Sequence, residues 1–166
     1  MPRVDPDPAS DERTTLTQFL TFLRHTMLLK AEGLTEEQAR MTLTPDGLSV
    51  LTLVRHMVEV ERGWFQKSFL GRDVPYQWCD DEDRDRDFHP GPDDTLAEAV
   101  DLYWREIAAS DAVIAAADLD QLEARADRDT GRVNLRWILV HMIEETGRHC
   151  GHADLIRESI DGSVGE

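Results

Sequence analysis

The stretch Trp137-Ile-Leu-Val-His141-Met-Ile-Glu-Glu145-Thr-Gly-Arg-His149-Cys-Gly-His152 places three histidines and a carboxylate at helical spacing. An α-helix turns about 100° per residue, so positions 141, 145, 149 and 152 fall within an arc of roughly 80°. These four groups therefore form one stripe on one helical face. Imidazole and carboxylate groups together suit a divalent metal, so the segment predicts a long helix that carries a metal site.

Capping signals and apolar spacing extend this helical pattern over the rest of the chain. The helix that holds the stripe is predicted from Asn134, a favourable N-cap, to about residue 160, with Gly162 as its stop. Apolar residues at helical spacing predict three more long helices, over about 14–29, 49–70 and 95–117. Ser49 is a favourable N-cap for the second of these, and two capping boxes open the third and a short additional helix, Thr95-Leu-Ala-Glu98 and Thr35-Glu-Glu-Gln38.

The sequence shows no alternation typical of strands and no internal repeat, so we predict an all-α fold, a four-helix bundle. Residues 1–12 are rich in proline and aspartate and are predicted to be a disordered tail. Residues 13–162 are predicted to form one helical domain. The segments 72–94 and 118–133 are predicted to be irregular. The first is long for a connection in a bundle, so it either crosses over the bundle or covers a site.

Charge and composition exclude several classes of partner. The chain has 34 acidic and 18 basic residues and a formal net charge of −16, which argues against nucleic acid and against an anionic membrane surface. No apolar run approaches the roughly 18 residues of a membrane span, and the first residues lack the apolar core of a signal peptide. We therefore expect a cytoplasmic protein. The two cysteines predict neither a disulfide framework nor a thiolate cluster.

Glu145 and His149 are four residues apart, a spacing that lets two helical side chains bind one ion. A third ligand must come from another helix, and His56 is the one histidine inside the predicted helix 49–70. Three protein ligands leave a position open for water or substrate, as in catalytic sites. Spacing alone leaves a solvated Glu–His pair equally open. His25 and His89 are interpreted as surface or hydrogen-bonded histidines.

Two segments resemble a known group of proteins. They are Leu53-Val-Arg-His-Met-Val-Glu-Val60, which contains His56, and the run from Glu144 through His149 and His152 to Glu158. The chain resembles the DinB-like superfamily and, more closely, its branch of mycothiol-dependent maleylpyruvate isomerases among small actinobacterial proteins. The resemblance covers nearly the whole chain after the tail. It implies four helices with a long crossover and a divalent metal at one end.

The ligands implied by the resemblance are one histidine of the second helix and a pair on the last, which fall on His56, Glu145 and His149. We expect zinc, with nickel, iron and manganese as alternatives. His152 stands where many relatives have glutamine, and we interpret it as the general base or proton shuttle. Ligation by His152 stays open. His141 either supports a ligand or fills the core.

The expected function is that of a thiol-dependent S-transferase or isomerase, in which a low-molecular-weight thiol such as mycothiol attacks a small electrophile. The alternatives are a metal-dependent hydrolase, a non-catalytic metal- or ligand-binding module related to stress, and a purely structural dimer. Gly147 and Gly151 lie four apart in the last predicted helix. They indicate a close helix crossing or a homodimer contact, and a small molecule is the expected substrate.

Two charged features are interpreted as ordinary surface. The run Asp80-Asp-Glu-Asp-Arg-Asp-Arg-Asp87 is predicted to be a solvated loop. Arg24, Arg55 and Arg148 are predicted to form surface ion pairs, with bidentate binding of a substrate carboxylate as the alternative.

Overall fold

The structure is a computed structural model that describes residues 3–45, 47–126 and 131–165. Its first long helix, α1 (Glu12–Ala31), begins where the Asp11 side chain accepts a hydrogen bond from the Thr14 N–H. The short helix α2 (Glu36–Ala39) follows, and the predicted capping box between Thr35 and Gln38 is formed in both directions. Each helix begins and ends within about two residues of the expected positions, the usual uncertainty of helix ends.

The second long helix changes its winding along its length. Ser49 caps α3 (Val50–Glu61) as predicted, and the chain continues without a break as the π-helix η1 (Arg62–Phe69). Gly63, in the first turn of η1, lies against Tyr76, whose hydroxyl would be 3.3 Å from a Cβ at that position. The sequence predicted the extent of this helix but not the π-helical turns, which are rare and occur frequently at functional sites.

The last two long helices are α4 (Leu96–Ala116) and α5 (Leu135–Asp161). Thr95 accepts from the Glu98 N–H at the start of α4, but the Glu98 carboxylate binds the Thr95 hydroxyl instead of its backbone, so this capping box is half formed. At the end of α5, Gly162 has the left-handed conformation expected of a helix stop, with φ of 76°. Within the described ranges the chain has no β-strand, only an isolated bridge.

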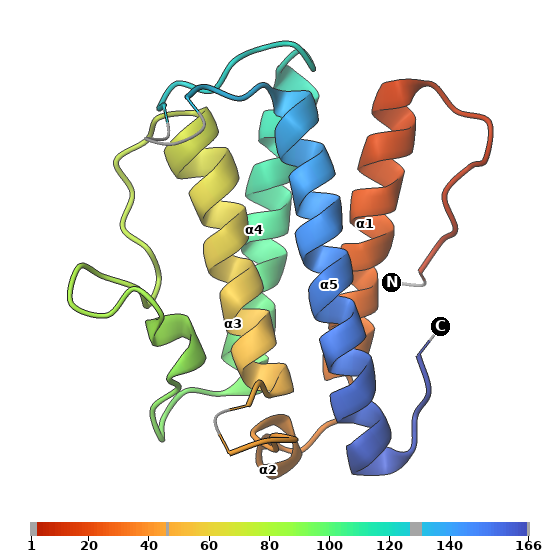
Figure 1. Ribbon diagram of the computed structural model, residues 1–166, viewed down its shortest axis with the longest axis vertical. Coiled ribbons are helices and arrows are strands. Elements are labelled where there is room, and N and C mark those ends of the chain that lie inside the picture. The colour runs from red at the N-terminus through yellow and green to blue at the C-terminus, as the bar shows by residue number, and fades with distance from the viewer. Residues whose placement is uncertain (1–2, 46, 127–130, 166) are drawn as a thin grey trace.

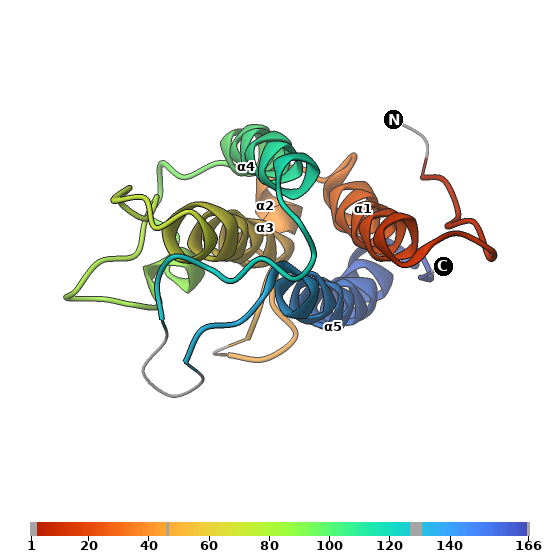
Figure 2. The same ribbon diagram turned by 90° about the horizontal axis from the view of Figure 1, so that it is seen from above.

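The four long helices form the predicted bundle, with α1 and α5 running in one direction and α3 and α4 in the other (Figures 1 and 2). α1 packs mainly against α5, and α3 mainly against α4. Because α3 and α4 are parallel, residues 70–95 must return from one end of the bundle to the other, which confirms the long crossover. This crossover contains the short 3₁₀-helix η2 (Arg86–Phe88) and lies along the outer side of α3.

The interior consists of two apolar clusters separated by a polar layer. One cluster lies toward α2 and the other toward the opposite end of the bundle. Between them each long helix contributes one polar side chain that is at most 1% exposed: Arg24, Glu61, Ser110 and Thr146. Arg24 binds Glu61 through Nε and Nη2, each at 2.6 Å from a carboxylate oxygen. The prediction of a surface ion pair for Arg24 is therefore wrong, since its partner lies on the inner face of α3.

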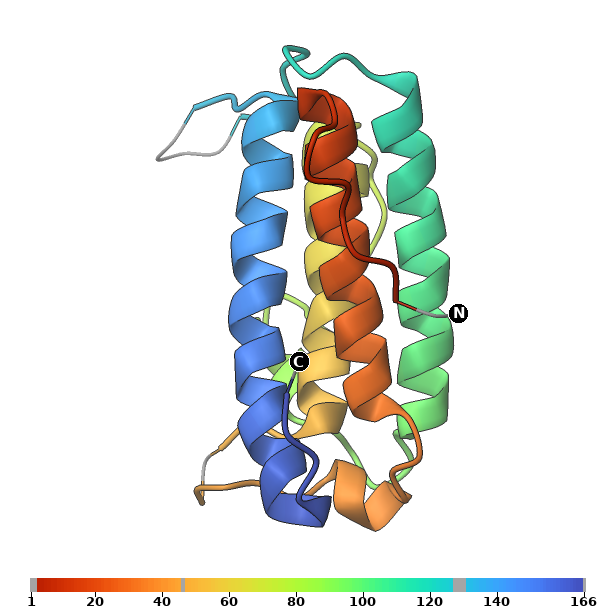
Figure 3. The same ribbon diagram turned by 90° about the vertical axis from the view of Figure 1, so that its right-hand side faces the viewer.

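The first and last long helices, α1 and α5, pack closely at Gly147, one of the two glycines for which a close helix crossing was an expectation. A Cβ added at Gly147 would lie 3.7 Å from Leu23 of α1, whereas one at Gly151 would meet nothing within 4 Å. Gly147 therefore faces α1 within the same chain, and the homodimer contact stays a prediction. Residues 3–11 turn back along α1, where the Asp7 N–H donates to Gln18 at 2.7 Å (Figure 3). The disorder predicted for 1–12 and the single domain 13–162 stay predictions. Residues 1–2 and 127–130, which belong to segments predicted to be irregular, lie outside the described ranges.

Candidate metal centre

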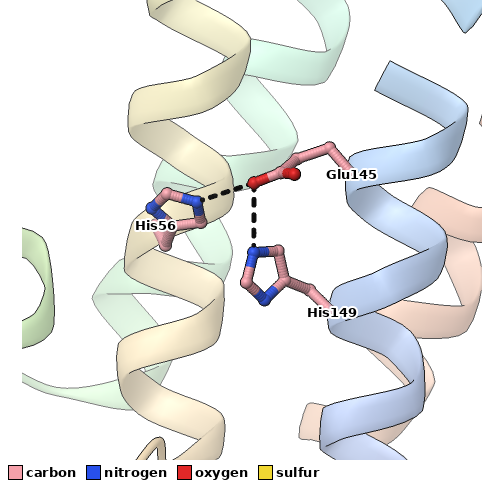
Figure 4. A group of neighbouring side chains, drawn as sticks. All are labelled: His56, Glu145 and His149. Atoms are coloured by element: carbon pink, nitrogen blue, oxygen red, sulfur yellow. Dashed lines mark hydrogen bonds and ion pairs between the residues drawn. The ribbon is translucent and has the colours of Figure 1, made fainter. Parts of the chain in front are cut away.

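Three donor groups predicted from the sequence meet between α3 and α5 (Figure 4). His56 projects from α3, and Glu145 and His149 project from successive turns of α5. One carboxylate oxygen, Glu145 Oε1, lies 3.2 Å from His56 Nε2 and 3.2 Å from His149 Nε2. One donor atom from each of the three side chains lies within 4.8 Å of the other two. The structure thus brings together residues that are 89 positions apart in the chain.

The donor set fits a divalent cation by chemistry and spacing. Two imidazole nitrogens and one carboxylate oxygen are a common set for zinc and other first-row divalent metals. Ligands about 2.1 Å from a tetrahedral ion lie about 3.4 Å from one another. The two nitrogen–oxygen distances of 3.2 Å are close to that separation. The three donor atoms all lie within 4.8 Å of one another, so a cation can be held here once the two histidine rings move closer together, and three ligands leave a coordination position open.

Asp87 is the functional residue that sequence reasoning missed. The His56 Nδ1 donates to Asp87 Oδ2 at 2.7 Å, so the other ring nitrogen, Nε2, faces Glu145. The Cys79 thiol donates to the second oxygen of Asp87 at 3.3 Å, and Phe88 stacks on the His56 ring with centroids 4.7 Å apart. Asp87 is 3% exposed, so the prediction of a solvated loop over residues 80–87 is wrong at its last residue.

A carboxylate that orients a metal-binding histidine is a recurrent arrangement in metal sites, because it fixes the ring and its tautomer. Asp87 could have been suspected from Phe88, an aromatic residue next to a strongly acidic run, which indicates that this part of the loop packs against the bundle.

The crossover is fixed to α3 at this point by buried charged side chains. Arg55 donates to the carbonyl oxygens of Asp87 at 2.9 Å and Arg86 at 2.8 Å. One turn further, the Glu59 carboxylate accepts the backbone N–H groups of residues 77, 78 and 79 at 3.0, 2.6 and 3.0 Å. Arg55 is 1% exposed and pairs with Asp94, so its predicted place at the surface is wrong. The loop that carries Asp87 is thereby held in position before any ligand binds.

The two histidines of the centre are shifted in opposite directions. Burial by itself lowers the pKa of His56, but hydrogen bonds to the Asp87 and Glu145 carboxylates outweigh it and raise the pKa above 6.5. Burial and the neighbouring His56 lower the pKa of His149. Burial raises the pKa of Glu145, but hydrogen bonds from His56 and charge interactions with His149 outweigh it, so this pKa is lowered. Of the two histidines, His56 therefore binds a proton more readily than His149.

The other histidines of the stripe lie beside the centre and do not join it. The His152 Nδ1 lies 3.4 Å from His149 Nδ1, on the ring nitrogen that does not face Glu145. His141 stacks on Trp137 at 5.3 Å and meets Trp64 edge-on at 4.8 Å. Among the described residues, the cluster of donors contains three side chains, and neither His152 nor His141 supplies a fourth. The general-base role of His152 stays a prediction.

The remaining surface histidines and Arg148 lie outside the centre's donor set. His25 packs against Trp104 with ring centroids 5.6 Å apart, and the exposed His89 binds Asp83. Arg148 is exposed and pairs with Glu144 and, at 3.4 Å, with Glu145, in agreement with the predicted surface ion pair.

A cavity of about 720 Å³ opens beside His56. It lies between the outer side of α3 and η1, the crossover and the middle of the connection from α4 to α5. Its size is typical of sites for small molecules. The lining combines apolar, aromatic and charged side chains, among them His56, Val60, Trp64, Lys67, Tyr76, Asp87 and Arg125. Of the three donors, His56 lines this cavity, so the cavity borders the candidate metal centre at that residue.

The fold and the site define a class of protein. Its members are helical bundles that carry two histidines and one carboxylate as metal donors beside a cavity. The chain matches the model of the family described as Mycothiol-S-transferase over residues 15–162. Since this match spans most of the chain, the protein belongs to that family, and the resemblance to a DinB-like branch is confirmed. A comparison with curated proteins gave no match. No helix within the described ranges combines the length and hydropathy needed to cross a bilayer.

Proposed function

We propose that the protein is a divalent-metal-dependent transferase that joins a low-molecular-weight thiol, mycothiol, to a small electrophile. The observation that carries the proposal is the open, three-donor centre His56, Glu145 and His149 beside a cavity, in a chain of the Mycothiol-S-transferase family. Zinc is the cation we expect, with nickel, iron and manganese as alternatives. A resident cation would lower the pKa of a thiol bound to it, so that thiolate is available at neutral pH.

The chain's own residues supply orientation and proton acceptance. Asp87 holds His56 with Nε2 directed at the centre, and Glu145 lies between the two histidines. The thiol loses its proton, a carbon–sulfur bond forms, and the leaving group departs with the electrons of the bond that breaks. We propose His152, which contacts His149 from behind, as the group that accepts the thiol proton. In an isomerisation the same thiol would be released again.

The alternatives to a transferase differ in what occupies the fourth coordination position of the centre. A sequestering, non-catalytic protein would close its site with a fourth protein ligand, and the cavity beside His56 favours catalysis. A hydrolase would use water as nucleophile in the same centre. Product analysis distinguishes these two, because transfer yields a thioether that contains the thiol. We also infer a cytoplasmic location, a small-molecule substrate and no nucleic-acid partner, and the homodimer stays a prediction.

The first experiment is elemental analysis of the untagged protein together with His56→Ala, His149→Ala and, as a matched control, His89→Ala. We expect about one divalent ion per chain in the protein and in the control, and loss of the ion in both centre variants. The protein loaded with metal is then assayed with mycothiol and a panel of electrophiles. Absence of metal after titration, or absence of turnover across the panel, would remove the catalytic proposal.

A further inference from the structure

The cavity beside His56 has a second, cationic end. Lys67 lies eleven residues beyond His56 on the same continuous helix and also lines the cavity. At about 1.5 Å per residue, the two positions are at most about 16 Å apart along the axis. The backbone N–H of Arg125 donates to the carbonyl of Ser68 at 3.1 Å, which places Arg125 next to Lys67 in the wall. One end of the cavity is therefore bounded by His56, one of the three donors, and the other end carries two cations.

These two cations keep most of their hydrogen-bonding capacity. Lys67 donates to the carbonyl of Val74 at 2.5 Å and lies 4.4 Å above the Tyr76 ring, but it has no carboxylate partner among the described residues. Arg125 has one, Asp73, at 3.8 Å, and that side chain is fully exposed. An ion pair of that length in solvent contributes little. The cavity wall contains bases and acids in similar number, in a chain whose net charge is −16: Lys67, Arg84 and Arg125 against Glu59, Asp80, Asp81 and Asp87.

Most carboxylates that line the cavity already bind other groups of the protein. The Glu59 carboxylate is occupied by three backbone N–H groups, and Asp87 by His56 and Cys79. Asp80 accepts two N–H groups of its own turn and pairs with Arg86. Asp81 and Arg84 also line the cavity, both are exposed, and their charges are opposite. The donors left over for a ligand at the end remote from His56 are therefore those of Lys67 and Arg125.

We propose that the electrophile is a carboxylate-bearing molecule, and that Lys67 and Arg125 determine this specificity by binding the carboxylate while the reacting carbon lies at the metal centre. The inference rests on the proposed transferase function and extends it to a substrate class. Lysine and arginine donate charge-assisted hydrogen bonds to carboxylates, and a half-buried cavity screens them less than open solvent does. Trp64 and Val60, between the two ends, provide apolar contact for the body of the substrate.

The test compares two electrophiles that differ in one charge, 6-(bromoacetamido)hexanoate and its methyl ester, with the metal-loaded full chain and mycothiol. In both reactions the sulfur–carbon bond forms, the carbon–bromine bond breaks, bromide leaves with the electron pair, and the thiol proton passes to His152 and from there to solvent. We expect kcat/KM for the acid to exceed that for the ester by about 10- to 100-fold, the value of one or two hydrogen bonds to a charged group.

The variants Lys67→Met and Arg125→Gln should each reduce this acid-to-ester ratio about tenfold. Arg72→Gln is the matched control, because Arg72 is an exposed cation of the crossover that does not line the cavity. Equal kcat/KM for the two compounds, or a ratio that neither variant changes, would overturn the assignment.

Equilibrium binding separates this inference from the proposed function. The unreactive 6-acetamidohexanoate and its methyl ester are titrated against the metal-loaded chain without thiol, and tryptophan fluorescence is recorded. Tighter binding of the acid, lost in Lys67→Met, supports the carboxylate site even if no electrophile is turned over, and in that case the transferase proposal alone fails. Turnover of the ester together with no preference in binding would leave the transferase and remove the carboxylate site.

Discussion

Asp87 decides which nitrogen of His56 is available to a cation, because its carboxylate accepts the Nδ1 proton at 2.7 Å. We predict that Asp87→Asn lowers the affinity for Zn²⁺ by about 10- to 100-fold, the usual effect of removing a carboxylate behind a ligating histidine. Competition with a chromophoric chelator measures this affinity. Asp85→Asn, an exposed neighbour in the same loop, is the control. Equal affinities for the two variants would contradict the orienting role of Asp87.

The raised pKa of His56 predicts how metal uptake depends on pH. Burial alone lowers this pKa, but the Asp87 and Glu145 carboxylates raise it above 6.5, so a cation must displace a proton from His56 Nε2. The affinity for Zn²⁺ is therefore constant above the raised pKa and falls about tenfold per pH unit below it. Asp87→Asn removes one of the carboxylates and moves this decline to lower pH. An affinity that is unchanged between about pH 6 and about pH 8 would exclude the shared proton.

At the scale of single residues, the three donors could be predicted from the sequence, but Asp87, which orients one of them, could not. Helical periodicity places Glu145 and His149 on one face, and the family resemblance adds His56 from a distant helix. Asp87 could not be reached in this way, because it belongs to a loop without periodicity and is one of many acidic residues there. Its selection depends on where Arg55 and Glu59 fix the crossover, which is a property of the folded chain.

At the scale of the element, α3 and η1 organise both the bundle and the loop outside it. One side of this helix is buried in the core, while Arg55, His56, Glu59, Arg62 and Lys67 all bind the crossover. The caps at Ser49 and Thr35 were predictable because they are local patterns. The π-helical winding of η1 was not, because it accompanies contacts with Tyr76 and with residues 124 and 125, which lie far away in the sequence.

Glu59 attaches this element to the crossover through three backbone N–H groups. We predict that Glu59→Ala lowers the free energy of unfolding by about 3 kcal/mol, because it leaves three backbone N–H groups without their charged acceptor. Glu59 is 5% exposed, so solvent screens this interaction little. Urea denaturation measures the change, with the exposed Glu37→Ala as control. A loss below about 1 kcal/mol would show that water replaces Glu59 at these N–H groups.

At the scale of the whole molecule, the polar layer divides the core into two apolar clusters. We predict that Arg24→Met lowers the free energy of unfolding by about 3–5 kcal/mol, because Glu61 is then a buried charge without its partner. The double variant Arg24→Met/Glu61→Leu should recover most of that loss, since it replaces the pair by apolar side chains of similar size. Urea denaturation of both variants measures these free energies of unfolding. A double variant as unstable as the single one would show that the layer contributes more than the pairing of two charges.

The overall topology was predictable in part. Four amphipathic helices and one connection too long for a tight turn indicate a bundle with a crossover, and both are present. Which helices pair was not predictable, because each apolar stripe can pack against several neighbours. The parallel pairing of α3 with α4, and of α1 with α5, becomes apparent only from the assembled chain (Figure 2).

Because α1 packs mainly on α5 and α3 mainly on α4, the bundle resembles two halves that meet along a seam. The centre crosses that seam, with His56 on one half and Glu145 and His149 on the other. A bound ion would therefore join the halves as well as serve chemistry, and a concentration of free ion one hundred times its dissociation constant would add about 2.7 kcal/mol to stability. Removal of the ion by a chelator should consequently increase amide hydrogen exchange in α3 and α5 along the seam more than at the α1–α5 contact. The stability of the contact between the two halves would then depend on the concentration of free metal.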